Sequence, residues 1–205
     1  MKTRTKALLL VMCAVLLVVT TVMATLAFLT STTKVVKNTF TVGNVVITLD
    51  EAPVDANGKK TTGDRVFENT YKLLPGHVYD KDPIVHVDAD SEDCWLFVKI
   101  TDEIAAIQDA TTIAAQLTTN GWTLVAGETN VYAYRETVSG GANVPVFESF
   151  KVVGDITNEA LAAYADKTIT VQAYAIQADG FGTAAAAWAA APSNWTAPAD
   201  TTANP

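Results

Sequence analysis

The stretch CWLFVKIT, residues 94–101, decides the fold class, because it is apolar on both faces of an extended chain. A strand of that kind has to be covered on both sides, so we expect it at the centre of a sheet. A second strand is predicted at residues 168–177, TITVQAYAIQ. Its alternation places four residues on one face, namely Ile169, Val171, Ala173 and Ala175. These two segments predict a mainly β domain.

The segments around these two strands also have strand patterns. We expect strands at residues 38–49 with a bulge at Gly43-Asn44, at 66–74, at 78–90 with a break near Pro83, in a hairpin over 122–138, and at 144–153. Short helices are predicted at both ends of 102–121, at 155–167 with Thr157 as N-cap, and at 181–191. About eight strands with few helices between them favour an antiparallel, jelly-roll-like sandwich over residues 38–191.

The N-terminus combines three basic residues, Lys2, Arg4 and Lys6, with an uncharged run over residues 7–29. This order is typical of a secretory signal peptide, here residues 1–27, with cleavage between Ala27 and Phe28. The run is also long enough for an uncleaved transmembrane anchor, which needs about 20 residues. Both interpretations place the domain outside the cell, because the basic residues stay in the cytoplasm.

The charge balance excludes one class of partner. Without the first 27 residues the chain keeps 11 basic residues against 22 acidic ones, so the domain is acidic and unsuited to nucleic acid. Cys94 is the only cysteine beyond Cys13, so no internal disulfide is expected after cleavage. Cys94 is interpreted as a small buried hydrophobe, with a reactive thiol as the alternative.

Three stretches resemble the TasA/camelysin family of exported bacterial proteins, whose signal peptides are cut by SipW-type peptidases. The first is the junction at Ala27-Phe28 followed by NTFTVGNVVITL. The second is LLPGHVYDKDPIVHV, residues 73–87, which leads into SEDCWLFVKI. The third is ITVQAYAIQADGF followed by AAAAWAA, which ends at residue 190. Residues 102–154 carry nothing specific to that family.

The resemblance implies a secreted jelly-roll protein that serves as a biofilm-matrix or surface fibre subunit. In that family the segment after the cut becomes a strand that pairs with the open sheet of the next subunit, which is β-augmentation. Here the donor segment would be residues 28–37, anchored by Phe28 and Leu29 at one end and Val35 and Val36 at the other. The alternative is an N-terminus with no such task.

Camelysin has been described as a metallopeptidase, and this resemblance raises the question of a metal. Only His77 and His86 are present, and neither belongs to a His-Glu-x-x-His motif. The acidic stretch HVDADSED offers His86, Asp88 and Asp90 as weak candidates for a divalent cation such as Ca²⁺, although its spacing is not that of an EF-hand. The alternative is a solvated turn between two strands. No catalytic residue and no cofactor are predicted.

The sequence therefore predicts an exported, acidic structural protein that self-associates into fibres. During export it would interact with a signal peptidase. The alternatives are a camelysin-type cell-surface metallopeptidase and a monomeric surface binding module. The tail at residues 192–205 is rich in Pro, Thr and Ala and is expected to be disordered.

Overall fold

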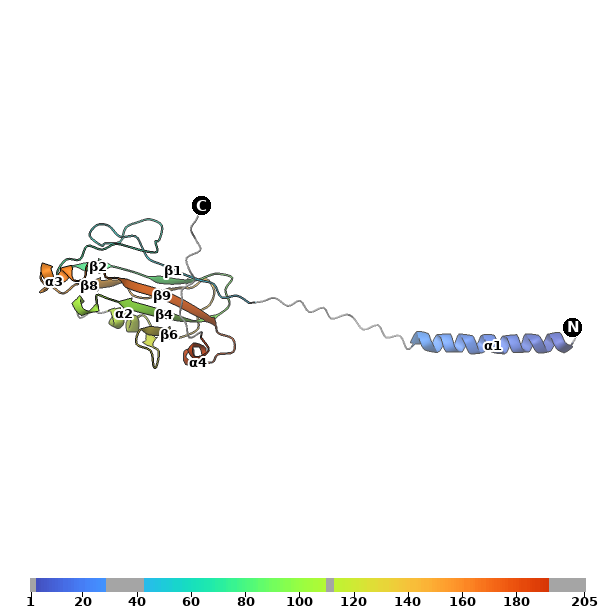
Figure 1. The fold of residues 1–205 in the computed structure, drawn as a ribbon. Helices are drawn as coiled ribbons and strands as arrows, with labels where there is room; N and C mark the ends of the chain where they lie inside the picture. Colours follow the sequence, from blue (N-terminus) through green and yellow to red (C-terminus); the bar gives the residue numbers. More distant parts are fainter. Residues whose placement is uncertain (1–2, 29–42, 110–112, 192–205) are drawn as a thin grey trace. The chain divides into compact units, whose positions relative to one another are not determined.

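A computed structural model describes residues 3–28, 43–109 and 113–191 of the chain (Figure 1). They belong to two separate units, of which the first contains helix α1, Thr3–Phe28. The apolar side chains of α1 from Leu8 to Val18 are exposed. Within the described residues, no helix combines the length and the apolar character that crossing a membrane requires.

The second unit is mainly β, as the sequence predicts. Its described part has nine strands, which are β1 (Ile47–Asp50), β2 (Val78–Asp80), β3 (Ile84–Val87), β4 (Cys94–Asp102), β5 (Trp122–Leu124), β6 (Val131–Tyr134), β7 (Asn143–Pro145), β8 (Ser149–Lys151) and β9 (Ile169–Gln177). All strand pairs are antiparallel. The strand orders are β1-β3-β7, β2-β8 and β5-β6-β4-β9.

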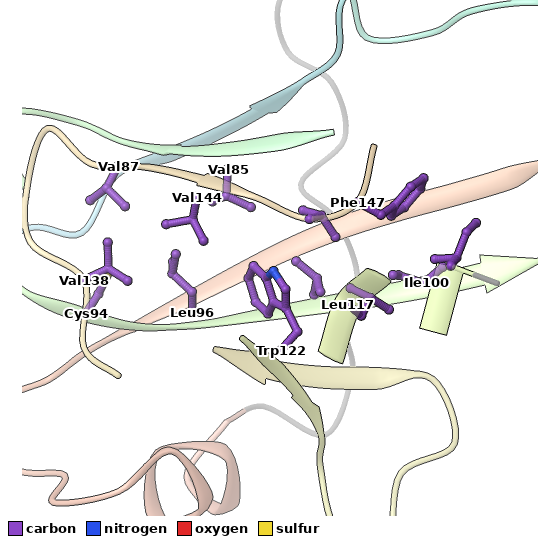
Figure 2. Packing of buried hydrophobic residues seen from close by; sticks show 13 residues of the cluster. Val85, Val87, Cys94, Leu96, Ile100, Leu117, Trp122, Val138, Val144 and Phe147 are labelled. Atoms are coloured by element: carbon purple, nitrogen blue, oxygen red, sulfur yellow. The ribbon is translucent and has the colours of Figure 1, made fainter. Parts of the chain in front are cut away.

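The main core lies between the three-stranded and the four-stranded sheet. Cys94, Leu96 and Ile100 of β4 face Val85, Val87 and Val144 of β3 and β7 (Figure 2). The alternate residues of β4, Trp95 and Phe97, enter a second core that helix α4 (Ala184–Ala189) covers with Ala187 and Trp188. Both faces of β4 are therefore covered, and the predicted central position of this strand is confirmed.

The short helices occur close to where the sequence predicts them. Helix α3, Asn158–Ala162, begins after Thr157, whose side chain accepts a hydrogen bond from the Ala160 N–H, so the predicted N-cap is confirmed. Helix α2, Ile113–Thr119, ends two residues before Gly121. At the other end of that insertion the predicted helix is a single 3-10 turn, η1, Ala105–Ile107.

The strand predicted at residues 66–74 is wrong. Only Val66 pairs, with Glu51 at the end of β1. The next hydrogen-bonded pair of an antiparallel ladder would place Glu68 opposite Leu49, and opposite residues point to the same face. Leu49 packs against the main core, so this pairing would turn the Glu68 carboxylate towards apolar side chains. The side chain of Asn69 instead bonds to the Val54 N–H and the Ala52 carbonyl.

The strand predicted at residues 144–153 is two strands. β7 pairs with β3, whereas β8 pairs with β2. Between them Val146 and Phe147 are both fully buried, which a continuous strand with one buried face does not allow. The Gln116 side chain of α2 bonds to the N–H and the C=O of Ser149 at the start of β8.

The first predicted strand is shorter than expected. β1 begins at Ile47, and residues 43–46 lie outside any strand, so the strand with a bulge at Gly43-Asn44 is wrong over this part. The Asn44 and Val46 carbonyls nevertheless bond to the Glu92 and Asp88 N–H groups, beyond the end of β3. Residues 38–42 of the prediction lie outside the described residues.

Gly140→Ala is expected to destabilise the domain by about 1–3 kcal/mol, as overpacking does. A Cβ at this position would lie 2.7 Å from the Ala89 carbonyl oxygen and 2.8 Å from that of Ser91. Backbone cannot move aside as a flexible side chain can. Gly182→Ala is the control, because nothing lies within 4 Å of its Cβ. Urea unfolding measures both, and equal midpoints for the two variants would contradict the close approach.

Candidate functional site: the free edge of β9

His86 lies on the outer face of the three-stranded sheet, between β1 and β7. Its Nε2 is 2.9 Å from Asp50 Oδ1, and its Nδ1 is 2.6 Å from Asn143 Oδ1. Asp50 also accepts a hydrogen bond from Arg65 Nε. The imidazole is therefore held by cross-strand neighbours that the sequence does not place beside it, and neither Asp88 nor Asp90 is among these partners.

The two acidic candidates beside His86 belong to a turn. Asp88 Oδ1 accepts a hydrogen bond from the Asp90 N–H at 3.0 Å, and both residues are exposed. Across the described ranges, no three His, Cys, Asp or Glu side chains gather as metal ligands would. A divalent cation at these residues, and the metallopeptidase alternative, stay predictions.

Cys94 is buried in the main core, as a small hydrophobe would be. Burial raises the pKa of its thiol to about 11, and the neighbouring Asp93 charge adds to this rise. A reactive cysteine needs the thiolate, so this environment disfavours reactivity.

The predicted cleavage and donor residues fall at the limit of the described chain. Ala27 and Phe28 are the last two residues of α1. Leu29, Val35 and Val36 lie outside the described residues, as does the predicted tail at 192–205.

A network of charges ties the loop after β1 to the start of β3. The Asp82 carboxylate accepts a hydrogen bond from the Ala52 N–H at 2.8 Å and pairs with Lys60 Nζ at 2.9 Å. Burial opposes ionisation of Asp82, but the bonds from Lys60 and Ala52 and the nearby Arg65 charge outweigh it, so its pKa is lowered. The ionised carboxylate therefore stabilises the folded state.

The domain is expected to lose this stabilisation in acid. A lowered pKa in the folded state contributes stability that is fully present above the ordinary value of 3.8 and is lost as the pH falls below it. Asp82→Asn should lower the free energy of unfolding at neutral pH by about 1–3 kcal/mol and weaken its pH dependence below that value. Urea unfolding at several pH values measures both effects. An unchanged acid dependence, equal to that of the exposed control Asp64→Asn, would contradict this role.

Strand β9 forms one border of the four-stranded sheet. It pairs with β4 along its whole length, and no described strand pairs with its other side. The Ala178 N–H bonds to the Asp93 carbonyl at 2.7 Å, and the Glu103 N–H bonds to the Thr168 carbonyl at 3.1 Å. Both bonds join residues that are opposite in the β4–β9 register, so the bonded pairs fall on the even-numbered residues of β9.

The hydrogen bonds on the other side of β4, towards β6, agree with this assignment of bonded pairs to the even-numbered residues of β9. The Ile100 N–H bonds to the Asn130 carbonyl, and Cys94 exchanges bonds with Val138, so even-numbered residues of β4 bond away from β9. The odd-numbered residues of β9 therefore direct their N–H and C=O groups away from β4. These groups, on Ile169, Val171, Ala173, Ala175 and Gln177, are named the β9 edge.

The core is incomplete beside the β9 edge. The inward residues of β4, such as Leu96 and Val98, are fully buried, whereas Val171 and Ala173 of β9 are only half-buried. β1 lies next to β9 across the sandwich (Figure 1), and its core-facing Ile47 is also half-buried. Apolar side chains thus remain partly accessible on this side of the domain.

The other sheet borders carry features that discourage pairing. β7 contains Pro145, β2, β5 and β8 have three residues each, and the outer side of β1 is occupied at Glu51 by its pairing with Val66. β9 has nine residues and neither a charge nor a proline. Natural proteins shorten, charge or bend exposed edges to prevent association, so an unprotected edge of this length is suited to accepting another strand.

Comparison with protein-family models, with curated proteins and with solved structures found no match to this chain. The sequence pattern predicts β9 as a strand but does not show that no described strand pairs with its outer side. The available signal was the absence of charged residues and proline from residues 169–177.

Proposed function

We propose that the protein is an exported structural subunit that assembles into fibres when residues 28–37 of one copy add to the β9 edge of the next. The observation that carries this proposal is the length of the β9 edge together with its lack of protecting features. The sandwich would be of the jelly-roll type, and cleavage between Ala27 and Phe28 would free the donor segment.

An added strand would pair with the outward N–H and C=O groups of β9 and would also cover its half-buried apolar side chains. Its backbone would bond to the N–H and C=O groups of the β9 edge, which gives affinity without a matching side-chain pattern. Its side chains would cover the half-buried Val171 and Ala173. Burial of apolar surface contributes about 25 cal/mol per Å², so completing the core adds to the main-chain bonds.

The donor segment has a composition that fits this task. Phe28, Leu29, Val35 and Val36 are its large apolar residues, and they stand at its two ends. Between them lie small polar residues and Lys34. Such a segment is polar enough to stay dissolved before pairing, and its apolar ends could anchor it after pairing.

Removal of the donor segment is expected to abolish fibres. The purified domain beginning at Phe28 should form filaments visible by negative-stain electron microscopy. A chain beginning at Asn38 should stay monomeric in size-exclusion chromatography, because it cannot supply the added strand. A second variant replaces residues 28–37 by an equally long Gly/Ser segment and separates loss of side chains from loss of length. Filaments that persist without residues 28–37 would overturn the mechanism.

A further inference from the structure

A largely shielded lysine, a buried glutamate and an asparagine meet beside the ends of β1 and β2. Lys81 Nζ donates to Glu51 Oε2 at 2.7 Å, and Asn69 Nδ2 donates to Glu51 Oε1 at 3.0 Å. One carboxylate therefore holds the amine of the lysine and the amide of the asparagine on its two oxygens. The Lys81 and Glu51 side chains are only 11% and 6% exposed, which makes theirs the most shielded ion pair among the described residues.

We propose that Lys81 and Asn69 join in an intramolecular isopeptide bond, with Glu51 as the residue that moves the proton. The reaction needs three groups, which are an amine, a carboxamide and a base that contacts both. All three are present here, and no cofactor, oxidant or second substrate is required.

Hydrogen bonds fix the orientation of the asparagine amide. Its Oδ1 accepts a hydrogen bond from the Val54 N–H at 3.1 Å, and its Nδ2 also donates to the Ala52 carbonyl at 2.9 Å. The N–H donor draws electron density from the amide carbon and would stabilise the negative oxygen that forms when an amine adds to it. These partners also fix which end of the amide is oxygen and which is nitrogen.

Backbone contacts hold the three residues in place. Glu51 exchanges two hydrogen bonds with Val66, and the Lys81 N–H donates to the Glu148 carbonyl at 3.0 Å. Asn69 is held by the loop at residues 52–54 through the bonds described above. Groups held in this way react as if at very high concentration, which is how proteins promote slow amide chemistry without a second substrate.

The surroundings of the carboxylate are shielded from water. Burial raises the pKa of the neighbouring Tyr71 hydroxyl, and the negative charges of Glu51, Asp82 and Asp80 raise it further. A buried ion pair is weak evidence for stability, because desolvation offsets most of its attraction. A reaction at Lys81 would replace this ion pair by a neutral amide.

The bond changes balance without a redox step. Glu51 takes a proton from the Lys81 ammonium, and the neutral amine attacks Cγ of Asn69. The new C–N bond forms as the bond from Cγ to Nδ2 breaks. Glu51 passes this proton to the departing nitrogen, which leaves as ammonia, and takes up the second proton that the attacking nitrogen has to lose. The ammonium of Lys81 and the carboxylate of Glu51 thus become a neutral amide and a neutral carboxylic acid. The product is an amide that joins the two side chains and closes a covalent loop over residues 69–81. Both cysteines of the chain are free thiols, so the isopeptide bond would cross-link the fold covalently where no disulfide does.

Peptide mapping of the folded full-length chain tests the proposal. Trypsin cuts after Arg65, Lys72, Lys81 and Lys99 in an unlinked chain and releases peptides 66–72, 73–81 and 82–99. With the isopeptide bond, Lys81 is blocked, and peptides 66–72 and 73–99 leave together as one branched product. Its mass should be the sum of the two peptides less one ammonia. Free peptides 66–72 and 73–81 from the folded chain, without the branched product, would overturn the proposal.

Variants separate this bond from other losses of ammonia. Glu51→Gln keeps the shape but not the base, and Lys81→Arg keeps the charge but not the amine, so both should lose the branched product completely. Lys60→Arg is the matched control, because Lys60 pairs with Asp82 and should leave the product unchanged. Ammonia loss at Asn57-Gly58 would map to a different peptide. If a variant does not fold, the map of the unmodified chain still decides.

Discussion

Ala173→Pro is expected to prevent filament formation while leaving the subunit folded. Ala173 directs its N–H away from β4, so proline at this position removes a hydrogen bond to an added strand and none within the sheet. Proline is tolerated on edge strands whose N–H faces outwards. Negative-stain microscopy should show no filaments under conditions in which the unmodified domain forms them. Circular dichroism should show an unchanged fold.

Gln172→Pro is the matched comparison for this effect. Its N–H belongs to the bonded pair with Lys99 of β4, so proline there breaks the sheet itself. The cost to stability should be about 3 kcal/mol or more, in contrast to the neighbouring position. The two variants lie one position apart, but Ala173→Pro should lose filament formation and keep its stability, whereas Gln172→Pro should lose stability. Filaments of normal length from folded Ala173→Pro would rule out the β9 edge as the acceptor.

Trp122→Ala is expected to have the largest effect on stability, about 3–5 kcal/mol. Trp122 is fully buried, contacts Tyr134 with ring centroids 5.1 Å apart, and donates from its indole N–H to the Pro145 carbonyl at 2.9 Å. It therefore joins β5 of one sheet to β7 of the other (Figure 2). A loss of this size is a large part of the 5–15 kcal/mol that is typical for a domain.

Urea unfolding followed by fluorescence measures this loss. Leu124→Ala is the control in the same strand, because Leu124 is 48% exposed and its truncation should change stability by less than about 0.5 kcal/mol. Similar midpoints for Trp122→Ala and Leu124→Ala would contradict the assigned role of the indole between the sheets.

The strands that the sequence predicted well are those whose own residues determine their environment. Residues 94–101 are apolar on both faces, so no arrangement other than a central strand buries them. Residues 169–177 alternate regularly, and four of them face the core as predicted. Residues 66–74 also have strand-forming side chains, but their pairing depends on the partner. Beyond Val66 the register with β1 would bury Glu68, and a single-sequence pattern does not contain that information.

The candidate sites were harder to predict for the same reason. An edge is defined by the strands that do not pair with it, so it follows from topology. The lack of charge and proline in residues 169–177 indicates an unprotected strand only once that strand is known to lie at a sheet border. Glu51, Asn69 and Lys81 are separated by 18 and 12 positions in the sequence, a spacing that matches no local motif. They meet because Glu51 follows β1, Lys81 follows β2, and Asn69 lies in the loop between these strands. His86, Asp88 and Asp90 lie close in sequence, and yet the fold gives His86 different partners.

Residue-resolved amide hydrogen exchange before and after assembly tests the central claim most directly. In the subunit without a donor, the Gln172 and Tyr174 amides should be protected by β4, whereas those of Val171, Ala173 and Ala175 should exchange quickly. On assembly, these three amides should become protected, because an added strand accepts their hydrogen bonds. If filaments form and the Val171, Ala173 and Ala175 amides still exchange as fast as in the subunit, the β9 edge is not where the subunits join.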